Sequence, residues 1–160
     1  MTQLRIGQGV DVHPFSDAPR PLVLGGVTIP GARGLAGHSD ADALCHAVAD
    51  ALLGALALGD LGSMFGVDEP EVAGAASLRL LAEVVARVHG AGWRVGNVDA
   101  TVIAQRPRLA PHREAMRRAL APVLAVELDA VSVKATTTDK LGAMGRAEGI
   151  ACMAVATVLR

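Results

Sequence analysis

The first strand carries the pattern that most limits how this chain can fold. Residues 4–12 are predicted to form a strand of mixed alternation, with Asp11 near its end and His13 directly after it. Because successive side chains of a strand point to opposite faces, this carboxylate and this imidazole point the same way. Together with His46, from an Ala- and Leu-rich helix, they would supply one oxygen and two nitrogens. That set suits Zn²⁺ and leaves a fourth position open for chemistry, so a shared ion would join the helix to the strand.

Each part of this pattern also has a simpler explanation. An isolated Asp-x-His pair fits a chance arrangement on the surface. A histidine in an apolar helix, such as His46, is usually a core residue whose hydrogen bonds are satisfied. The upstream carboxylate–imidazole pair and the helix histidine together favour the metal site.

Composition sets the size and class of the protein. The 160 residues are predicted to form one domain, residues 1–160. Hydrophobic residues make up 51% of the chain and charged residues 19%, which is typical of a globular protein and not of a disordered one. Aromatic residues contribute 2%, so the core must be built from closely packed Leu, Val and Ala. So much apolar surface on a small chain indicates that part of it is buried between subunits.

Charge and cysteine usage exclude several kinds of partner. The formal net charge of −1 argues against nucleic acid, and a helix face explains most of the basic cluster between residues 106 and 118. No signal-type segment and no apolar stretch of about 18 residues appear, so no membrane partner is expected. Cys45 and Cys152 lack C-x-x-C spacing and are expected to be buried thiols in a reducing compartment, which predicts a cytoplasmic location.

Hydrophobic periodicity predicts alternating strands and helices. Ser39 or Asp40 is the expected cap of the first helix, and Pro122 is expected to end or kink the third. Residues 59–74 lack periodicity and are predicted to form a mobile loop. The mixture predicts an α+β fold of mixed α/β layers, with one sheet that carries helices on one face. The predicted strands are 4–12, 95–104, 130–137 and 149–159, with a hairpin at 22–24 and 27–29, and the predicted helices are 39–58, 77–89 and 111–125.

Two segments contain groups suited to phosphate. Residues 134–140 end a strand with three threonines and Asp139, and hydroxyls can donate to phosphate oxygens while a carboxylate holds a divalent ion on them. The same residues also fit a β-branched strand end and a turn. Residues 37–42 precede the long helix, whose N-terminal amides attract anions. There Ser39 either caps the helix or contacts a phosphate, and His38 alone fits an exposed loop residue.

The motifs in their order along the chain indicate a protein family more specifically than any single motif does. Along the chain they are GVDVH (9–13), HSDAD (38–42), HxxxDALLGA (46–55), LGDLG (58–62), GNVD (96–99), VKATTT (133–138) and GRxEGIA (145–151). With these motifs the chain closely resembles the 2-C-methyl-D-erythritol 2,4-cyclodiphosphate synthase family of the non-mevalonate isoprenoid pathway. The resemblance covers essentially the whole chain.

The resemblance implies a homotrimer with active sites between adjacent subunits, and zinc ligands at Asp11, His13 and His46. The implied substrate is 4-diphosphocytidyl-2-C-methyl-D-erythritol 2-phosphate. Its 2-phosphate attacks the diphosphate phosphorus nearest the erythritol, closes a cyclic diphosphate and expels CMP, so the protein needs no Ser or Cys nucleophile. A second divalent ion, Mg²⁺ or Mn²⁺, is implied at Asp139. An apolar channel on the threefold axis, with Arg146 near its mouth, is implied to accept an isoprenoid diphosphate.

The resemblance also assigns residues to the substrate. His38 and Thr137 are implied to stabilise the phosphates in the transition state, Ser39 to contact them, and Asp60 and Gly62 to bind the erythritol part. The loop 104–110 and residues 136–139 are implied to receive the CDP part. The other implied substrate contacts are Asp11, His13, Ala104, Pro107, Arg108, Leu109, Ala110, Thr136, Thr138, Asp139 and Arg146.

Some positions depart from the family pattern, and two other functions would use the same features. Residues 66–69 replace a Pro-Asp-Thr-Asp-like stretch, and Ala143 and Gly37 stand where a bulkier apolar residue and Ala are common. Asp139 replaces Glu, which keeps the charge but shortens its reach. A trimeric ligand-binding protein for isoprenoid diphosphates would need no zinc, so the intact ligand set favours an enzyme. A metal-dependent phosphohydrolase would use the same ligands with water as the nucleophile.

Overall fold

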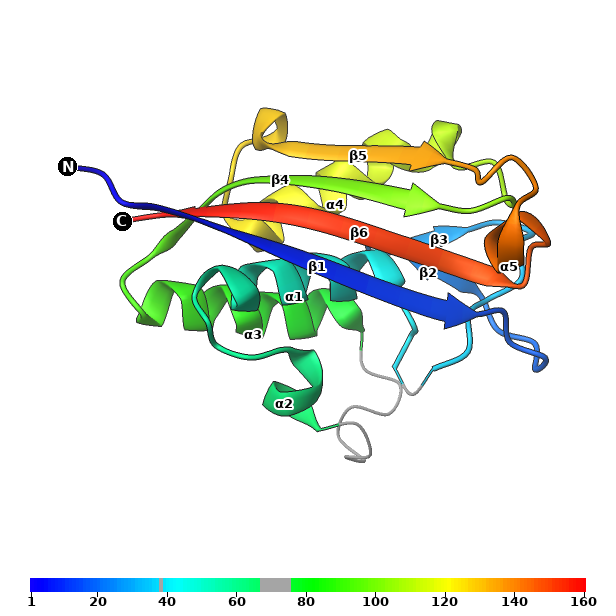
Figure 1. The fold of residues 1–160 in the computed structure, drawn as a ribbon, viewed down its shortest axis with the longest axis horizontal. Coiled ribbons are helices and arrows are strands. Elements are labelled where there is room, and N and C mark those ends of the chain that lie inside the picture. The colour runs from blue at the N-terminus through cyan, green and yellow to red at the C-terminus, as the bar shows by residue number, and fades with distance from the viewer. Residues whose placement is uncertain (38, 67–75) are drawn as a thin grey trace.

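A computed structural model describes residues 1–37, 39–66 and 76–160 of the chain. Its helices, strands and two 3₁₀ turns, labelled η, are arranged as Figure 1 shows. In chain order the elements are β1 (Leu4–Pro14), β2 (Leu22–Leu24), β3 (Val27–Ile29), α1 (Ala43–Ala55), α2 (Leu61–Phe65), α3 (Ser77–Gly90), β4 (Arg94–Ile103), η1 (Ala110–His112), α4 (Arg113–Leu124), η2 (Leu128–Ala130), β5 (Val131–Thr136), α5 (Gly142–Gly145) and β6 (Gly149–Leu159).

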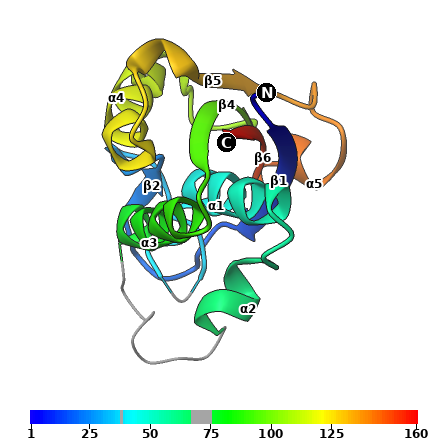
Figure 2. The same ribbon diagram turned by 90° about the vertical axis from the view of Figure 1, so that its left-hand side faces the viewer.

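A four-stranded mixed sheet forms one layer and the long helices form the other. The strand order is β1-β6-β4-β5, with β4 and β5 parallel and the other two pairs antiparallel, and β2 and β3 form a separate hairpin. Helices α1, α3 and α4 lie on the same side of the sheet, as the end-on view shows (Figure 2). The predicted mixed α/β layers with helices on one face are therefore confirmed.

Alternation along the strands separates the two faces of the sheet. On β6 the residues Cys152, Ala154 and Ala156 are buried beneath the helices, whereas Met153 and Val155 point to the uncovered face. Small core residues suit the aromatic-poor composition, because they let helices lie close to the sheet. The two cysteines are free and buried, as predicted.

Helix α1 lies directly on the backbone of β1, at two glycines. A Cβ atom built on Gly7 would lie 2.0 Å from the carbonyl oxygen of Ala51, and one built on Gly9 would lie 2.0 Å from that of Ala47. Real atoms do not approach so closely, so the contact requires glycine at both positions. Gly7, Gly9, Asp11 and His13 share one face of β1 by strand alternation, and the glycines therefore bring α1 down beside the two polar residues.

The first helix begins later and ends earlier than predicted. Neither Ser39 nor Asp40 caps it; its N-cap is Asp42, whose side chain accepts the backbone N–H of Cys45 at 3.0 Å. Ala41 has φ of +55°, a left-handed conformation that cannot continue a helix, and Ala57 has the same φ beyond the other end. Asp42 also accepts the N–H groups of Gly25 and Gly26, which ties the β2–β3 turn to the start of α1.

The segment predicted as a loop at 59–74 contains a helix. Asp60 and Ser63 form a reciprocal capping box at the start of α2, which compensates for the absence of a hydrophobic period. Residues 67–75 of that prediction lie outside the described residues. Pro122 neither ends nor interrupts α4, which continues to Leu124 and stops where Ala125 becomes left-handed.

The two ends of the described chain lie side by side. Gln3 and Arg160 exchange backbone hydrogen bonds of 2.7 and 3.0 Å, and the guanidinium groups of Arg5 and Arg160 lie 4.9 and 4.8 Å from the Trp93 ring centroid. In Figure 1 both ends lie at the left, away from α5. Among the described residues, no helix has the length and apolar character needed to cross a membrane.

The contact of α1 with β1 predicts the effect of adding a single methyl group. Gly9→Ala should lower the free energy of unfolding by about 1–3 kcal/mol or more, because a rigid backbone carbonyl occupies the space of the new Cβ. Gly54→Ala is the matched control at an exposed position of α1, where the new Cβ would lie 3.7 Å from the nearest atom outside the helix backbone, the carbonyl oxygen of Gln8. It should raise stability by about 0.5–1 kcal/mol. Urea unfolding of the metal-free proteins at one concentration measures both, and equal stabilities would contradict the packing argument.

Candidate metal centre and adjoining cleft

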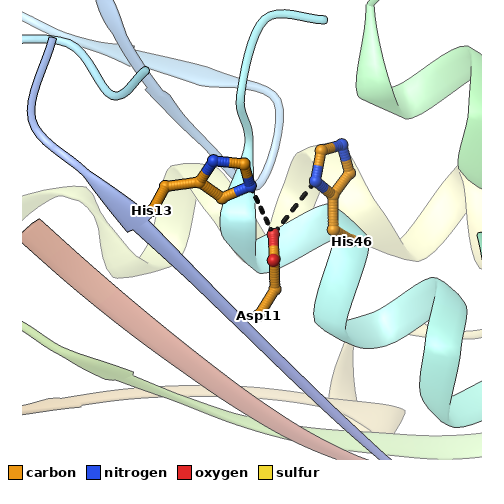
Figure 3. A group of neighbouring side chains, drawn as sticks. All are labelled: Asp11, His13 and His46. Carbon is orange, nitrogen blue, oxygen red and sulfur yellow. Dashed lines mark hydrogen bonds and ion pairs between the residues drawn. The ribbon is translucent and has the colours of Figure 1, made fainter. Parts of the chain in front are cut away.

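Asp11, His13 and His46 converge at the edge of the α1–β1 contact (Figure 3). The Oδ2 atom of Asp11 lies 2.9 Å from Nε2 of His13 and 3.0 Å from Nδ1 of His46. All three side chains are partly buried, and one ligand atom from each lies within 4.8 Å of the others. In the part of the chain that the structure describes, this is the one such group of three metal-binding side chains.

In each imidazole, the ring nitrogen that does not face Asp11 makes a hydrogen bond that fixes the orientation of the ring. Nδ1 of His13 lies 2.6 Å from the carbonyl oxygen of Ala36, which can only accept a hydrogen bond. His13 therefore carries a proton on Nδ1, and its Nε2 faces Asp11, where it donates a hydrogen bond when protonated and could bind a metal ion when deprotonated. Nε2 of His46 lies 3.0 Å from the hydroxyl of Ser77, so its Nδ1 faces Asp11. Outer hydrogen bonds of this kind are typical of histidines that bind metals.

The electrostatics of the group favour a cation among its three members. Burial alone would raise the pKa of the Asp11 carboxyl, but hydrogen bonds with His13 and His46 outweigh burial and hold this pKa well below its usual range. The hydrogen bond with Asp11 raises the pKa of His13 above its ordinary value, against the opposing effect of burial. The carboxylate thus stays charged and draws a positive charge, which a proton on an imidazole or a metal ion can supply.

The donor set fits a divalent metal ion. Two imidazole nitrogens and one carboxylate oxygen are a ligand set of catalytic zinc sites, with a fourth position left for water or substrate. The charge of the carboxylate offsets part of the charge of the ion, and the two outer hydrogen bonds already hold the rings. The residues present could therefore hold a metal ion without a change in fold.

A cleft of about 830 Å³ opens at the same end of the sheet. Of the residues that the family resemblance assigns to the substrate, seven line the cleft: Ala104, Pro107, Arg108, Leu109, Ala110, Thr136 and Thr137. Phe15 and Arg33 line it too and were not predicted. Arg33 is held there by its hydrogen bond to the Ser16 carbonyl and its ion pair with Asp17, and neither residue type carries a sequence signal for such a position.

The metal group and the threonine segment lie on different strands. His13 on β1 is paired with Ile150 on β6, and Thr136 on β5 is paired with Ile103 on β4. Three strand spacings of about 4.8 Å separate β1 from β5, or about 14 Å. Asp139 forms hydrogen bonds with Thr137 in the turn after β5. Among the described residues, Asp139 is not one of the side chains that converge with Asp11, His13 and His46.

The other predicted residues take several positions. Ser39 is buried beside His46, with 3.4 Å between its hydroxyl and Nε2, whereas Asp60 and Gly62 lie at the start of α2. Arg146 forms an exposed ion pair with Glu148, and the Thr138 hydroxyl donates to the carbonyl of Leu141. His38 lies outside the described residues.

Arg20 holds the chain on both sides of position 38. Its guanidinium donates to the carbonyl oxygens of Gly37 at 2.9 Å and of Ser39 at 2.6 Å. Nothing in the sequence around Arg20 indicates this contact, because it crosses from one loop to another.

Comparison with known proteins decides the family. The family model described as the YgbB family matches residues 4–159. The chain belongs to the YgbB family. This match, together with relatives that carry the synthase name, confirms the family resemblance predicted from the ordered motifs.

Relatives named 2-C-methyl-D-erythritol 2,4-cyclodiphosphate synthase match this YgbB-family chain along nearly its whole length. The protein from Cyanothece sp. is 54% identical over 159 residues, covering 99% of this chain and 98% of its own. The protein from Pseudomonas savastanoi is 56% identical over 157 residues, covering 98% and 99%.

Two solved structures match the fold. The bifunctional IspDF from Campylobacter jejuni has a TM-score of 0.95 and 38% identity over 99% of this chain, which covers 43% of that chain. The IspF–CDP complex from Plasmodium falciparum has a TM-score of 0.85 and 33% identity, covering 98% of this chain and 96% of its own.

Removing one imidazole tests the metal group. His46→Ala should abolish stoichiometric zinc binding while the protein stays folded, whereas His89→Ala, an exposed histidine near the end of α3, should retain it. Zinc at 100 times its Kd should raise the free energy of unfolding of the wild type by about 2.7 kcal/mol and leave that of His46→Ala unchanged. Elemental analysis and calorimetry measure the two effects; stoichiometric zinc in His46→Ala would contradict the assignment.

Proposed function

We propose that this chain converts 4-diphosphocytidyl-2-C-methyl-D-erythritol 2-phosphate into 2-C-methyl-D-erythritol 2,4-cyclodiphosphate and CMP. The observation that carries the proposal is near-complete similarity to enzymes named for this synthesis, at 54% and 56% identity, in a chain that also assembles a metal-type group. The reaction is a phosphorus–oxygen lyase reaction with ring closure, and residues 1–160 act as one domain.

The chemistry asks the protein for positioning rather than for a nucleophile. The 2-phosphate of the substrate attacks the diphosphate phosphorus nearest the erythritol, and the bond to the CMP oxygen breaks. Two phosphates must approach against their mutual repulsion, and holding them in place supplies up to roughly 7–11 kcal/mol of such a barrier. His38, Ser39 and Thr137 are proposed to hold the phosphates, with Asp60 and Gly62 on the erythritol part.

Two divalent ions are proposed to neutralise phosphate charge when they are bound. Asp11, His13 and His46 would hold Zn²⁺, which their donor types support. Asp139 would hold Mg²⁺ or Mn²⁺ together with diphosphate oxygens, since it offers a single carboxylate. The side chain of Asp139 is exposed after β5, where a diphosphate in the neighbouring cleft could reach it.

The cleft beside β5 is proposed to receive the CDP part. Its volume suits a nucleotide, and loop 104–110 and Thr136 and Thr137 line it. The Plasmodium falciparum relative was solved as a CDP complex, which supports a CDP-linked ligand for this chain.

We further propose a homotrimer in which neighbouring chains complete each site. Part of the uncovered face of the sheet is apolar: Ile6, Val10, Val12, Met153 and Val155 are each between 39% and 63% exposed. A sheet face of this kind is typical of a subunit interface. Within one chain, about 14 Å separates β1, which carries two of the metal-type residues, from β5, which ends in the threonines. In the proposed trimer, the threonine segment of a neighbouring chain lies beside the metal group instead.

Two finer assignments follow from the trimer and from the cysteines. An axial channel lined by the apolar sheet face would accept an isoprenoid diphosphate, with Arg146 as its anion-binding residue. The free, buried thiols of Cys45 and Cys152 suit a reducing compartment and so a cytoplasmic location.

A product assay tests the proposed reaction directly. Incubation of the zinc- and Mg²⁺-loaded protein with the CDP-linked substrate should release CMP and the cyclic diphosphate in equal amounts, measured by ³¹P NMR. Addition of a chelator should stop both, because the phosphate charge is then not neutralised. Release of CMP with a linear phosphate would instead identify a hydrolase.

Mixing two inactive variants tests the shared sites. His46→Ala and Thr137→Ala should each lose activity, but co-expressed chains should regain it, since some sites then combine an intact His46 with an intact Thr137. Random mixing restores roughly a quarter of the sites in a closed ring of three. Activity of tag-purified mixed trimers measures the effect, and separately purified variants combined without subunit exchange are the control. A stable, active monomer in sedimentation would refute the proposal.

A further inference from the structure

The outer nitrogen of His46 begins a chain of hydrogen bonds that leads away from the metal group. Nε2 of His46 lies 3.0 Å from Oγ of Ser77, the first residue of α3, which is 1% exposed. The Ser77 hydroxyl donates to Oδ1 of Asp40. The backbone N–H of Ser77 donates to Oδ2 of the same carboxylate at 2.9 Å, and the N–H of Asp42 donates to Oδ1 at 3.2 Å.

The direction of these bonds fixes the proton on His46. A carboxylate can only accept, so the single hydroxyl proton of Ser77 is committed to Asp40. Oγ of Ser77 then presents a lone pair to His46, which must donate from Nε2–H. With Nε2 committed to Ser77, Nδ1 of His46, which lies 3.0 Å from Asp11 Oδ2, is the nitrogen that could bind a metal ion.

Ser39 does not provide an equivalent contact. Its hydroxyl lies farther from His46 Nε2, at 3.4 Å, and already accepts the backbone N–H of Ala41 at 3.1 Å. The two histidines of the group also differ. His13 is oriented by a backbone carbonyl, which no substitution removes, whereas His46 depends on a side chain that can be changed.

We propose that Ser77 and Asp40 are positioning residues for the metal ion, acting through His46. The inference rests on the proposed metal site at Asp11, His13 and His46 and extends it to α3. Ser77 selects the tautomer of His46 and the angle of its ring, and Asp40 holds the hydroxyl of Ser77 in the accepting orientation. The carboxylate of Asp40 simultaneously satisfies an N–H at the start of α3, so the helix and the ligand share one anchor.

Substitution of Ser77 separates this role from a structural one. Ser77→Ala removes the hydroxyl but keeps the backbone N–H that Asp40 accepts, so α3 can still start at the same residue. Zinc affinity should fall 10- to 100-fold, the range typical of lost outer-sphere partners. Ser77→Thr keeps a hydroxyl and should restore affinity to within a few-fold of the wild type. Ser132→Ala, the same change in a half-buried serine on β5, should leave affinity unchanged.

The experiment measures metal affinity and the geometry of the site, not turnover. Zinc Kd values come from competition with a chromogenic chelator, and Co²⁺-loaded proteins report the ligand geometry through their visible absorption bands. Ser77→Ala should shift and weaken these bands, whereas Ser132→Ala should reproduce the wild-type spectrum. A purely structural role of Ser77 would lower the thermal midpoint of the metal-free protein and leave the Co²⁺ spectrum unchanged.

A double-mutant cycle tests whether Asp40 acts through Ser77. Asp40→Asn should weaken zinc binding in the wild-type background and have no further effect in Ser77→Ala, because the intermediate hydroxyl is then absent. Additive losses would refute the proposed chain. If Ser77→Ala fails to fold by circular dichroism, the spectrum of Co²⁺-loaded Asp40→Asn decides the question.

The controls distinguish the two levels of the hypothesis. A wild-type protein that binds no zinc overturns the metal site itself, and with it the inference. A wild-type protein that binds zinc, together with an unchanged Kd in Ser77→Ala, overturns the positioning role and leaves the metal site intact.

Discussion

The approach of α1 to β1 over Gly7 and Gly9 is the contact on which the candidate site depends. Each glycine has a helix carbonyl where a Cβ would lie, so the two backbones meet without intervening side chains. The same strand face continues into Asp11 and His13, and the same helix carries His46. A helix held farther from the sheet by larger residues would move this imidazole out of reach. Packing of the smallest residues thus determines the geometry of the candidate metal group.

Two hydrogen-bond acceptors outside the candidate metal group orient its histidine rings. The Ala36 carbonyl and the Ser77 hydroxyl each accept from one ring, and both inner nitrogens are left facing Asp11. A positive charge on an imidazole or a metal ion satisfies the Asp11 carboxylate that both nitrogens face. Rings held in place in this way lose little freedom when they bind a cation, which increases the affinity of the group for one.

Much of the arrangement could be predicted from the sequence, and the failures share a cause. Strand alternation identified the shared face of Asp11 and His13, and apolar periodicity located α1, α3 and β6. The start of α1 was wrong because Ser39, Asp40 and Asp42 are all good caps, and the left-handed Ala41 that selects Asp42 has no sequence signal. Ser77 and Arg20 were missed since their partners lie in distant loops, where no spacing rule applies. Helix α2 depends on a capping box too short to show a period.

The two chain ends lie side by side near Trp93, so the fold should tolerate a change in where the chain begins and ends. Gln3 and Arg160 are already paired through their backbones, and they lie at the end of β1 and β6 opposite to the end where His13 pairs with Ile150. A short linker could therefore join them, and the chain could be reopened in an exposed turn such as the one at Ala91 and Gly92, between α3 and β4. A domain attached at either terminus would likewise project away from the cleft. The fold is thus suited to circular permutation and to fusion with other proteins.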